Sequence, residues 1–389
     1  MKIIKVAISQ RIIPQYRVPF FKELAKKQNI QLTVFYGDGF NIGTEVNANE
    51  IKGFNNQKLY TIKVPFKING TKRLVVFHPG LIISLIKGNY DVIITEPVTN
   101  ILNVIFIFLY VKLFRKKIIW HEAGGVNKSS RKILRKVIDP LVKLFIKNTD
   151  AFLTYNTYAN VYLSNNYKVY HEKIFLALNS IDTTGIKKDL IKYSNDNNDD
   201  SLTKSKDYKV ALFIGALEKR KRVENLIKAC GIINKQQNYC IKCWVIGDGP
   251  DINYIKSICT NDELDNTVFF GRKVDDLVKY ILFADVVVLP GQGGLSINHA
   301  LACGKPIIAT EEAYSPNTIS VYDYIKNGFN GYVADINNID DLASKISLVL
   351  YDEMHYKSLC TGAFTKAEEI SIEKMVDSFE KSIQYVLNI

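Results

Sequence analysis

Residues 286–306 read VVVLPGQGGLSINHALACGKP, and this stretch decides the fold. Four apolar residues predict a buried strand over 286–289, a proline ends it, and a helix is expected over 294–303. Gly291, Gly293 and Gly294 lie between them and let the backbone approach a ligand closely. Ligands of parallel α/β sheets bind just beyond the carboxyl ends of the strands, so this turn predicts an anion site suited to a diphosphate.

His299 lies about one and a half turns into the expected helix. From there its ring could reach past a diphosphate to a sugar hydroxyl. A lone histidine on a largely apolar helix is equally typical of a core residue whose hydrogen bonds are satisfied. Both interpretations stay open from the residues alone.

A strand expected over 209–214 is followed by a strongly basic turn. The turn begins at Gly215 and then carries four consecutive cations, Lys219, Arg220, Lys221 and Arg222. Cations at the start of a helix oppose the helix dipole, so their presence indicates an anionic ligand. A solvated basic turn is the alternative.

Two further turns after expected strands contain glycine. The strand over 241–246 is followed by Gly247, Asp248, Gly249 and Pro250, and the strand over 268–270 by Gly271 and Arg272. Each is a weak signal when taken alone, because glycine turns after parallel strands also have purely steric causes.

Short apolar strands alternate with helical segments throughout the chain, which predicts parallel sheets with crossover helices. The first half has expected strands at 3–9, 31–36, 91–95, 117–120, 151–154 and 173–176. A polar run over 193–201 predicts a linker or surface loop. We expect two Rossmann-like domains, 1–185 and 186–369, and a C-terminal helical segment, 370–389, that returns to the first domain.

Composition excludes a disordered or collagen-like chain, because 47% of the 389 residues are apolar and 23% are charged. Residues 1–185 hold 27 Lys and Arg against 11 Asp and Glu, or +16, and residues 186–389 hold 24 against 28, or −4. The basic half indicates an anionic partner, either a membrane surface or nucleic acid. Scattered aromatics and the lack of a recognition module argue against nucleic acid.

The longest near-continuous apolar stretch, 101–111, is too short to span a bilayer. The first residues alternate between polar and apolar and lack a cleavage-site pattern, so we expect no signal peptide and a cytoplasmic protein.

In order and spacing these segments resemble the family 4 glycosyltransferases, which are retaining, sugar-nucleotide-dependent enzymes of the GT-B fold. Five separately placed turns agree with that family's pattern: Gly215-Ala216-Leu217 with Lys221, Gly247 to Pro250, Phe269-Phe270-Gly271, Gly294-Leu295 with 300–306, and 325–331. The resemblance implies two Rossmann-like domains facing a cleft. It implies a UDP- or GDP-type sugar donor as substrate and no cofactor.

The resemblance also assigns residues. It implies that Lys221, nearby arginine and the amides of Gly294 and Leu295 stabilise the leaving diphosphate, so that no metal is required. Further donor-binding candidates are the glycines and cations of the other turns: Gly215, Arg220, Arg222, Gly247, Gly249, Gly271, Arg272, Gly291 and Gly293.

Three positions depart from the family pattern. The family's two glutamates, spaced by seven residues, correspond to Gly291 and His299, and its phosphate-binding arginine corresponds to Ala216. The resemblance implies that His299 still bonds ribose hydroxyls, and that Arg220 or Arg222 replaces the arginine. A donor sugar that lacks, or presents differently, the hydroxyls held by the first glutamate would account for Gly291.

The first half matches less closely. His121, in Trp120-His121-Glu122 at a strand end, resembles the family's N-domain histidine at the donor sugar, so His121, Lys221 and His299 are the catalytic candidates. Glu122 and Glu96, at strand ends, and Arg17, in an acceptor-side loop that differs from many relatives, are further substrate-binding candidates.

The implied function is transfer of a sugar to a glycan or lipid-diphosphate-linked acceptor in bacterial surface polysaccharide assembly, such as O-antigen or capsule. The cationic, amphipathic stretch 128–147 and the charge of the first half predict peripheral binding to the inner face of the cell membrane. For that stretch alone, a core helix with a solvated basic face is the alternative. Because both glutamates are absent, a non-catalytic sugar-nucleotide-binding protein is the second function.

Overall fold

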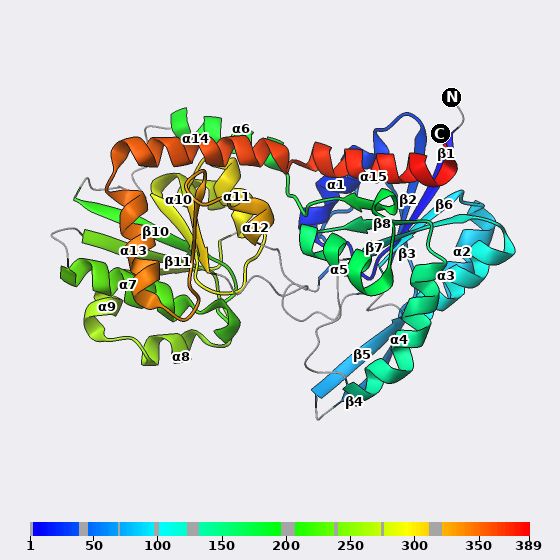
Figure 1. The fold of residues 1–389 in the computed structure, drawn as a ribbon, viewed down its shortest axis with the longest axis horizontal. Coiled ribbons are helices and arrows are strands. Elements are labelled where there is room, and N and C mark those ends of the chain that lie inside the picture. The colour runs from blue at the N-terminus through cyan, green and yellow to red at the C-terminus, as the bar shows by residue number, and fades with distance from the viewer. Residues whose placement is uncertain are drawn as a thin grey trace. The chain divides into compact units, whose positions relative to one another are not determined.

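The structure of the protein is a computed structural model that describes residues 3–38, 46–68, 71–96, 101–122, 132–195, 207–236, 240–273, 276–310 and 321–389. Contacts divide the chain into two compact units (Figure 1). Unit 1 comprises Met1–Ile181 together with Ile372–Ile389, and unit 2 comprises Asp182–Ser371. Both are parallel-sheet α/β units, so the predicted fold class is confirmed.

Unit 1 is built on a seven-stranded parallel sheet in the order β3-β2-β1-β6-β7-β8-β9. Its strands are β1 (Ile4–Ser9), β2 (Ile30–Tyr36), β3 (Asn55–Lys58), β6 (Val92–Thr95), β7 (Lys117–Glu122), β8 (Ala151–Thr154) and β9 (Ile174–Leu176). β4 (Ile62–Ile68) and β5 (Thr71–Phe77) form a separate antiparallel pair. The strand order reverses between β1 and β6, which is where ligands of such sheets usually bind.

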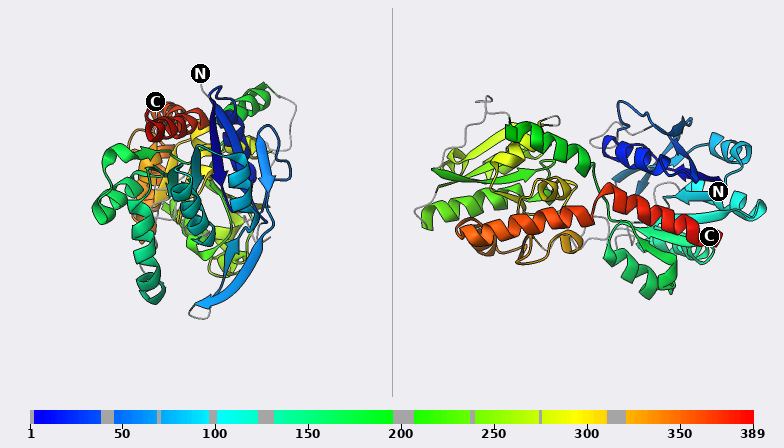
Figure 2. Two further views of the ribbon diagram at one scale, coloured as in Figure 1. Left: turned by 90° about the vertical axis from the view of Figure 1, so that its right-hand side faces the viewer. Right: turned by 90° about the horizontal axis from the view of Figure 1, so that it is seen from above.

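Helices cover both faces of the unit 1 sheet. One face packs against α1 (Val18–Ala25) and α15 (Ile372–Leu387), which lie side by side (Figure 2). The other face packs against α2 (Gly80–Gly88), α3 (Ile101–Leu113), α4 (Lys132–Lys147) and α5 (Thr157–Tyr167). Alternation along β1 explains this arrangement, because Ile4, Val6 and Ile8 face α1 and α15 while Ala7 faces the other side.

Unit 2 is built on a six-stranded parallel sheet in the order β12-β11-β10-β13-β14-β15. Its strands are β10 (Tyr208–Ile214), β11 (Cys240–Ile246), β12 (Thr267–Gly271), β13 (Val286–Leu289), β14 (Ile307–Thr310) and β15 (Gly331–Ala334). Its helices are α6 (Thr183–Asn195), α7 (Val223–Gln236), α8 (Ile252–Ser257), α9 (Asn261–Asp265), α10 (Leu277–Phe283), α11 (Ser296–Ala302), α12 (Val321–Tyr324), α13 (Ile339–Leu350) and α14 (Glu353–Glu369).

The sequence prediction differs from the structure at several places. Strands β3, β4, β5 and β15 and helices α5, α6, α9, α12, α13 and α14 were not predicted. The polar run over 193–201 does not mark the division, because α6 of unit 2 extends to Asn195 and the division falls at residue 182. The rest of that run lies outside the described residues. The C-terminal helix α15 packs on unit 1.

In the part of the chain that the structure describes, no helix is both long enough and apolar enough to cross a bilayer.

Candidate functional site

The basic turn of unit 2 connects β10 to α7 through a single 3-10 turn, Lys219–Lys221. The backbone N–H of Lys221 donates to the Glu218 carbonyl at 2.7 Å, and that of Arg222 donates to Lys219 at 3.1 Å. Arg222 has a left-handed φ of +50°, a conformation that favours glycine.

The glycine-rich turn after β13 lies directly against the basic turn. A Cβ on Gly291 would come within 2.6 Å of the Arg220 carbonyl oxygen and 2.7 Å of the Lys221 carbonyl carbon. The Gln292 N–H donates to the same Arg220 carbonyl at 3.0 Å. We call these two turns, residues 218–222 and 290–295, the double bend.

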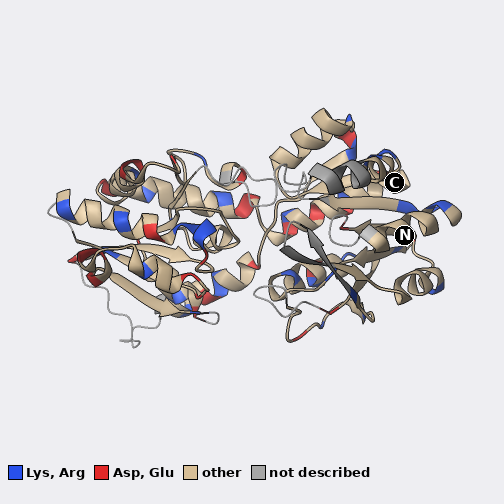
Figure 3. Cartoon of the chain, turned by 90° about the horizontal axis from the view of Figure 1, so that it is seen from below, with Lys and Arg blue, Asp and Glu red and all other residues tan. Residues whose placement is uncertain are grey.

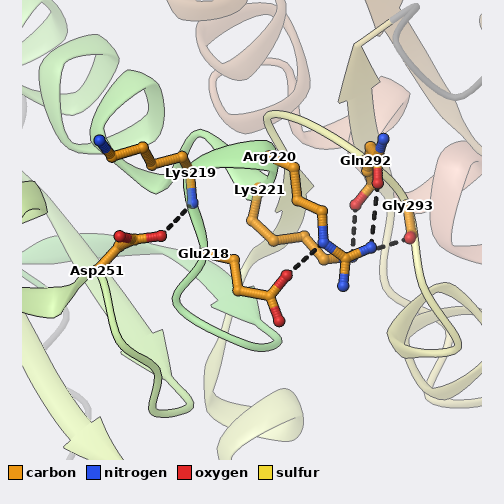
Figure 4. A network of polar contacts seen from close by, with 7 residues as sticks. All are labelled: Glu218, Lys219, Arg220, Lys221, Asp251, Gln292 and Gly293. Carbon is orange, nitrogen blue, oxygen red and sulfur yellow. Dashed lines mark hydrogen bonds and ion pairs between the residues drawn. The ribbon is translucent and has the colours of Figure 1, made fainter. Parts of the chain in front are cut away.

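The lysine side chain joins the two halves of the double bend (Figure 4). Lys221 Nζ donates to the carbonyl oxygens of Gln292 at 2.7 Å and Gly293 at 2.9 Å. Arg220 Nη1 donates to Gln292 Oε1 at 3.1 Å, and its guanidinium forms an ion pair with Glu218. The predicted convergence of the cationic turn and the glycine turn is therefore observed, with an ammonium group at the junction.

The structure explains Gly291 by packing. Because backbone atoms of the basic turn occupy the place of a Cβ, a glutamate at this position would force the two turns apart. A side chain larger than glycine at position 291 would therefore require the two turns to shift, and the link between Gly291 and the hydroxyls of the donor sugar stays a prediction.

His299 lies in the first turn of α11, because that helix begins at Ser296 and not at Gly294. Its Nδ1 is 3.3 Å from the carbonyl oxygen of Leu295, which lies in the double bend. Burial lowers the pKa of His299, although the Leu295 carbonyl raises it in part. The imidazole is thus neutral at neutral pH, and with Nδ1–H directed to Leu295, Nε2 is left as an acceptor.

Gly247 and Gly249 support the double bend from the other side. Gly247 has a φ of +145°, and a Cβ on it would lie 1.8 Å from the Gly215 carbonyl oxygen. A Cβ on Gly249 would lie 2.4 Å from the Leu217 carbonyl oxygen. The Lys219 N–H donates to Asp251 Oδ2 at 2.8 Å, which fixes the start of the basic turn. These glycines have a packing role of their own.

The remaining candidates of unit 2 lie outside this junction. Gly271 has a φ of +66° and its carbonyl accepts from the Gly247 N–H at 2.9 Å. Arg272 follows it and is exposed. Arg222 Nη1 donates to the Ile336 carbonyl at 3.3 Å. Arg220 contacts the glycine turn, so of the two arginines it is the better replacement for the family's arginine.

Unit 1 brings three predicted residues together in a second group. Arg17, Glu96 and His121 meet at the carboxyl ends of β1, β6, β7 and β8, where Gln10 and Tyr155 join them. We call these five residues the polar cluster. Gln10 Nε2 donates to Glu96 Oε1 at 3.2 Å, and Tyr155 Oη donates to the same oxygen at 3.4 Å. The predicted Glu122 ends β7, but its side chain lies outside the described residues.

His121 is held between aromatic rings and is almost fully buried. Its Nδ1 lies 3.4 Å from Tyr155 Oη, and its ring packs edge-on against Tyr155 and Phe379. Within the described residues its Nε2 atom is buried without a hydrogen-bond partner. Burial first, and then the charge of Arg17, lower the pKa of His121 well below its usual value. The ring is therefore neutral at neutral pH.

Charge in the polar cluster is balanced between Arg17 and Glu96. Burial raises the pKa of the Glu96 carboxyl, and Arg17 and Arg11 lower it in part. Burial opposes the charge of Arg17, but Tyr155, Tyr16 and Glu96 outweigh it and raise the pKa of the guanidinium. The Arg17 guanidinium also lies 5.4 Å from the centroid of the Tyr155 ring.

Sequence reasoning missed Gln10, Tyr155 and the residues of α15 that cover the cluster. Met375 accepts from Arg17 Nη1 at 3.4 Å, and Phe379 packs on His121. Gln10 and Tyr155 directly follow β1 and β8, so the rule that applied to Glu96 could have found them. No signal in the sequence pairs α15 with Arg17.

Part of the chain is similar in sequence to known proteins. Residues 194–364 match the family Glycosyl transferases group 1. The chain is 28% identical over 200 residues to "Uncharacterized glycosyltransferase MJ1178" of Methanocaldococcus jannaschii, covering 50% of this chain and 54% of that protein. It is 26% identical over 180 residues to N-acetyl-alpha-D-glucosaminyl L-malate synthase of Bacillus anthracis, covering 45% of each. The chain thus spans about half the length of these curated relatives.

Solved structures show a similar fold over the whole chain. Anabaena Alr3699/HepE in complex with UDP has a TM-score of 0.71 at 14% identity, and the match covers 99% of this chain and 100% of that one. Sucrose-phosphate synthase of Thermosynechococcus elongatus has a TM-score of 0.69 at 14% identity, with 99% of both chains covered. Residues 194–364 therefore resemble the Glycosyl transferases group 1 family, and the chain has the GT-B fold.

Proposed function

We propose that this protein is a retaining glycosyltransferase that moves a sugar from a nucleoside-diphosphate sugar to a glycan acceptor. The observation that carries the proposal is the double bend, where Lys221 Nζ and the Arg220 guanidinium meet the glycine turn after β13. Two cations beside glycine-rich backbone at the carboxyl ends of parallel strands suit a diphosphate.

The chemistry follows from this charge. During transfer the bond between the anomeric carbon and the diphosphate oxygen breaks, and that oxygen gains negative charge. Lys221 and Arg220 would stabilise it without a metal, each by an electrostatic contribution on the order of 3 kcal/mol. Lys221 Nζ donates to two carbonyls, so its position is fixed before a donor binds.

The proposed donor is a UDP-sugar, with a GDP-sugar as the other candidate. HepE, the structural neighbour, was solved with UDP and with UDP-glucose. Retention is supported by relatives whose names specify alpha linkages. One is poly(ribitol-phosphate) alpha-N-acetylglucosaminyltransferase of Staphylococcus aureus, which is 27% identical over 46% of this chain and 35% of that protein. Common nucleotide sugars are alpha-linked, so an alpha product implies retention.

The proposed acceptor is anionic, either lipid-diphosphate-linked or a polymer of surface polysaccharide assembly such as O-antigen or capsule. Residues 1–185 carry an excess of Lys and Arg, whereas unit 2 intersperses Asp and Glu with its cations (Figure 3). An anionic acceptor and an anionic membrane surface would both be attracted to unit 1. The proposed location is the inner face of the cell membrane, and no nucleic-acid partner is proposed.

Transfer by the purified protein tests the proposal. A panel of radiolabelled UDP- and GDP-sugars is incubated with lipid extract, and the Lys221→Met variant is compared with Lys219→Met. Lys219 is the matched control, because it lies in the same turn but is exposed, with its Nζ 4.3 Å from the Tyr254 ring centroid. We expect Lys221→Met to lower transfer by about 100- to 1,000-fold and Lys219→Met to leave it within about threefold.

One alternative has an observation in its favour. The positions of the family's two glutamates hold Gly291 and His299, which favours a non-catalytic sugar-nucleotide-binding protein. Tight UDP-sugar binding that depends on Lys221 without turnover of any donor would establish that alternative. Equal activity of the two lysine variants would contradict the role of the double bend.

A further inference from the structure

A stripe of large apolar side chains on α3 is exposed to solvent. Leu109 is 61% exposed and Leu113 is 77% exposed, and Phe106 lies on the same side of the helix. The spacing of three and then four residues places all three on one helical face. The opposite face of α3, with Val104, Ile107, Phe108 and Val111, is buried in unit 1.

The neighbouring helix continues this surface. α2 packs beside α3 (Figure 1) and exposes Ile83 and Ile86, at 54% and 48%. Phe114, just after α3, is also exposed. Exposed apolar side chains on two neighbouring helices indicate an interaction site. We call it the α2–α3 face, defined by Ile83, Ile86, Phe106, Leu109, Leu113 and Phe114.

α15 of the same unit differs from α3. Its apolar residues Met375, Phe379 and Ile383 are buried against α1 and the sheet. Unit 1 therefore buries the apolar face of α15, whereas Phe106, Leu109 and Leu113 of α3 remain exposed.

Exposed cations lie on and beside these two helices. Lys87 lies in the last turn of α2, Lys112 lies on α3, and Arg115 follows α3. The sequence over 97–121 contains no Asp or Glu. Apolar side chains with a rim of cations match the boundary between anionic lipid headgroups and acyl chains. A second copy of the chain is a poorer fit, because a symmetric interface would bring the same cations together.

We infer that the α2–α3 face inserts into the surface of an anionic membrane, with Leu109 and Leu113 reaching the acyl-chain boundary and the cations contacting headgroups. This inference deepens the membrane part of the proposed function. It concerns two helices outside the stretch 128–147, whose membrane binding stays a prediction because the side chains of 128–139 lie outside the described residues. It also predicts binding that has an apolar component in addition to the charge attraction.

Vesicle flotation tests the inference on the full chain. The probes are vesicles of phosphatidylcholine alone and with phosphatidylglycerol. The variant Leu109→Glu/Leu113→Glu is compared with Val161→Glu/Tyr170→Glu, which also introduces two glutamates, one at an exposed residue of α5 and one at an exposed residue after that helix. We expect wild type and control to float with the anionic vesicles, and partitioning of the α3 variant to fall by more than about tenfold. Equal flotation of all three proteins, or none by wild type, would overturn the inference.

Tryptophan fluorescence measures insertion directly. Both native tryptophans, Trp120 and Trp244, are buried, so a Leu109→Trp variant adds an exposed reporter. With vesicles containing brominated phosphatidylcholine, its emission should shift to the blue and be quenched, while that of Val161→Trp should not change. If Leu109→Trp is unaffected while the protein floats, binding is electrostatic only and the insertion is wrong.

Two further measurements separate the possible failures. Lys221→Met should float like wild type, and Leu109→Glu/Leu113→Glu should bind UDP like wild type. The diphosphate site of the double bend and the membrane binding of the α2–α3 face are then tested independently. Sedimentation should show that self-association does not depend on Leu109 and Leu113. If the Glu substitutions dissolve a dimer and vesicle binding is absent, the α2–α3 face is an interface between copies.

Discussion

The double bend of unit 2 and the polar cluster of unit 1 are held together by different forces. In the double bend, backbone meets backbone, as in the contact of Gly291 with the Arg220 carbonyl, and the cations remain partly exposed. In the polar cluster, side chains from separate elements meet almost without solvent, and Arg17 is 4% exposed. Steric fit therefore stabilises the double bend, and charge balance stabilises the polar cluster. We expect the two regions to respond to different substitutions.

The chain offers a separate reporter for each region. Trp120 lies in unit 1 and Trp244 in unit 2, and they are the only two tryptophans in the sequence. A Trp244→Phe background then reports unfolding of unit 1, and a Trp120→Phe background reports unfolding of unit 2. Each variant below is measured in both backgrounds.

The largest effect is expected from Arg17→Met, which keeps the apolar stem but removes the charge. Glu96 then remains buried without the nearby guanidinium, which we expect to cost on the order of 3 kcal/mol in the stability of unit 1. In urea, the Trp120 transition should shift to lower concentration, and the Trp244 transition should not move.

The double variant Arg17→Met/Glu96→Gln supplies the control. A neutral amide needs no cation, so we expect it to be more stable than Arg17→Met alone. The loss should also shrink at low pH. Because burial raises the pKa of Glu96 in the folded state, its protonated form is favoured there, and the penalty grows only as pH rises through that pKa. Additive, pH-independent losses would show that charge balance does not hold the cluster together.

Those two regions also differ in how far the sequence could predict them. The double bend consists of two short runs, 218–222 and 290–295, and glycines and cations at strand ends revealed both. The polar cluster depends on α15, whose Phe379 packs on His121 from more than 250 residues away in the chain. Pairing of such distant segments leaves no local pattern.

Some missed elements did have a local signal. Strands β4 and β5 flank Asn69-Gly70, a dipeptide that predicts a hairpin between alternating runs. Strand β3 has no such local signal, because its sequence Asn-Asn-Gln-Lys is polar. It is held by backbone pairing to β2 at the edge of the sheet.

An intermediate effect is expected from Gly291→Ala, which tests the steric fit of the double bend. The added Cβ meets backbone atoms of Arg220 and Lys221 at 2.6 to 2.8 Å, so the turns must separate at a cost of about 1–3 kcal/mol. The Trp244 transition should shift and UDP binding should weaken. Gly294→Ala is the matched control, since its Cβ would lie 3.5 Å from Lys221 Nζ, an ordinary contact. If the two variants behave alike, the close approach at Gly291 is unimportant.

The smallest effect is expected from Arg222→Gly, and it decides which arginine serves the double bend. Glycine relieves a left-handed φ of +50°, worth about 1 kcal/mol, but the substitution also removes a hydrogen bond to the Ile336 carbonyl of similar value. Stability of unit 2 should therefore change by less than about 1 kcal/mol. UDP binding should remain near wild type in Arg222→Gly and fall in Arg220→Ala, because the Arg220 guanidinium donates to Gln292 of the glycine turn. The reverse order would assign the diphosphate to Arg222 and would mean that its bond to Ile336 is exchanged for the ligand.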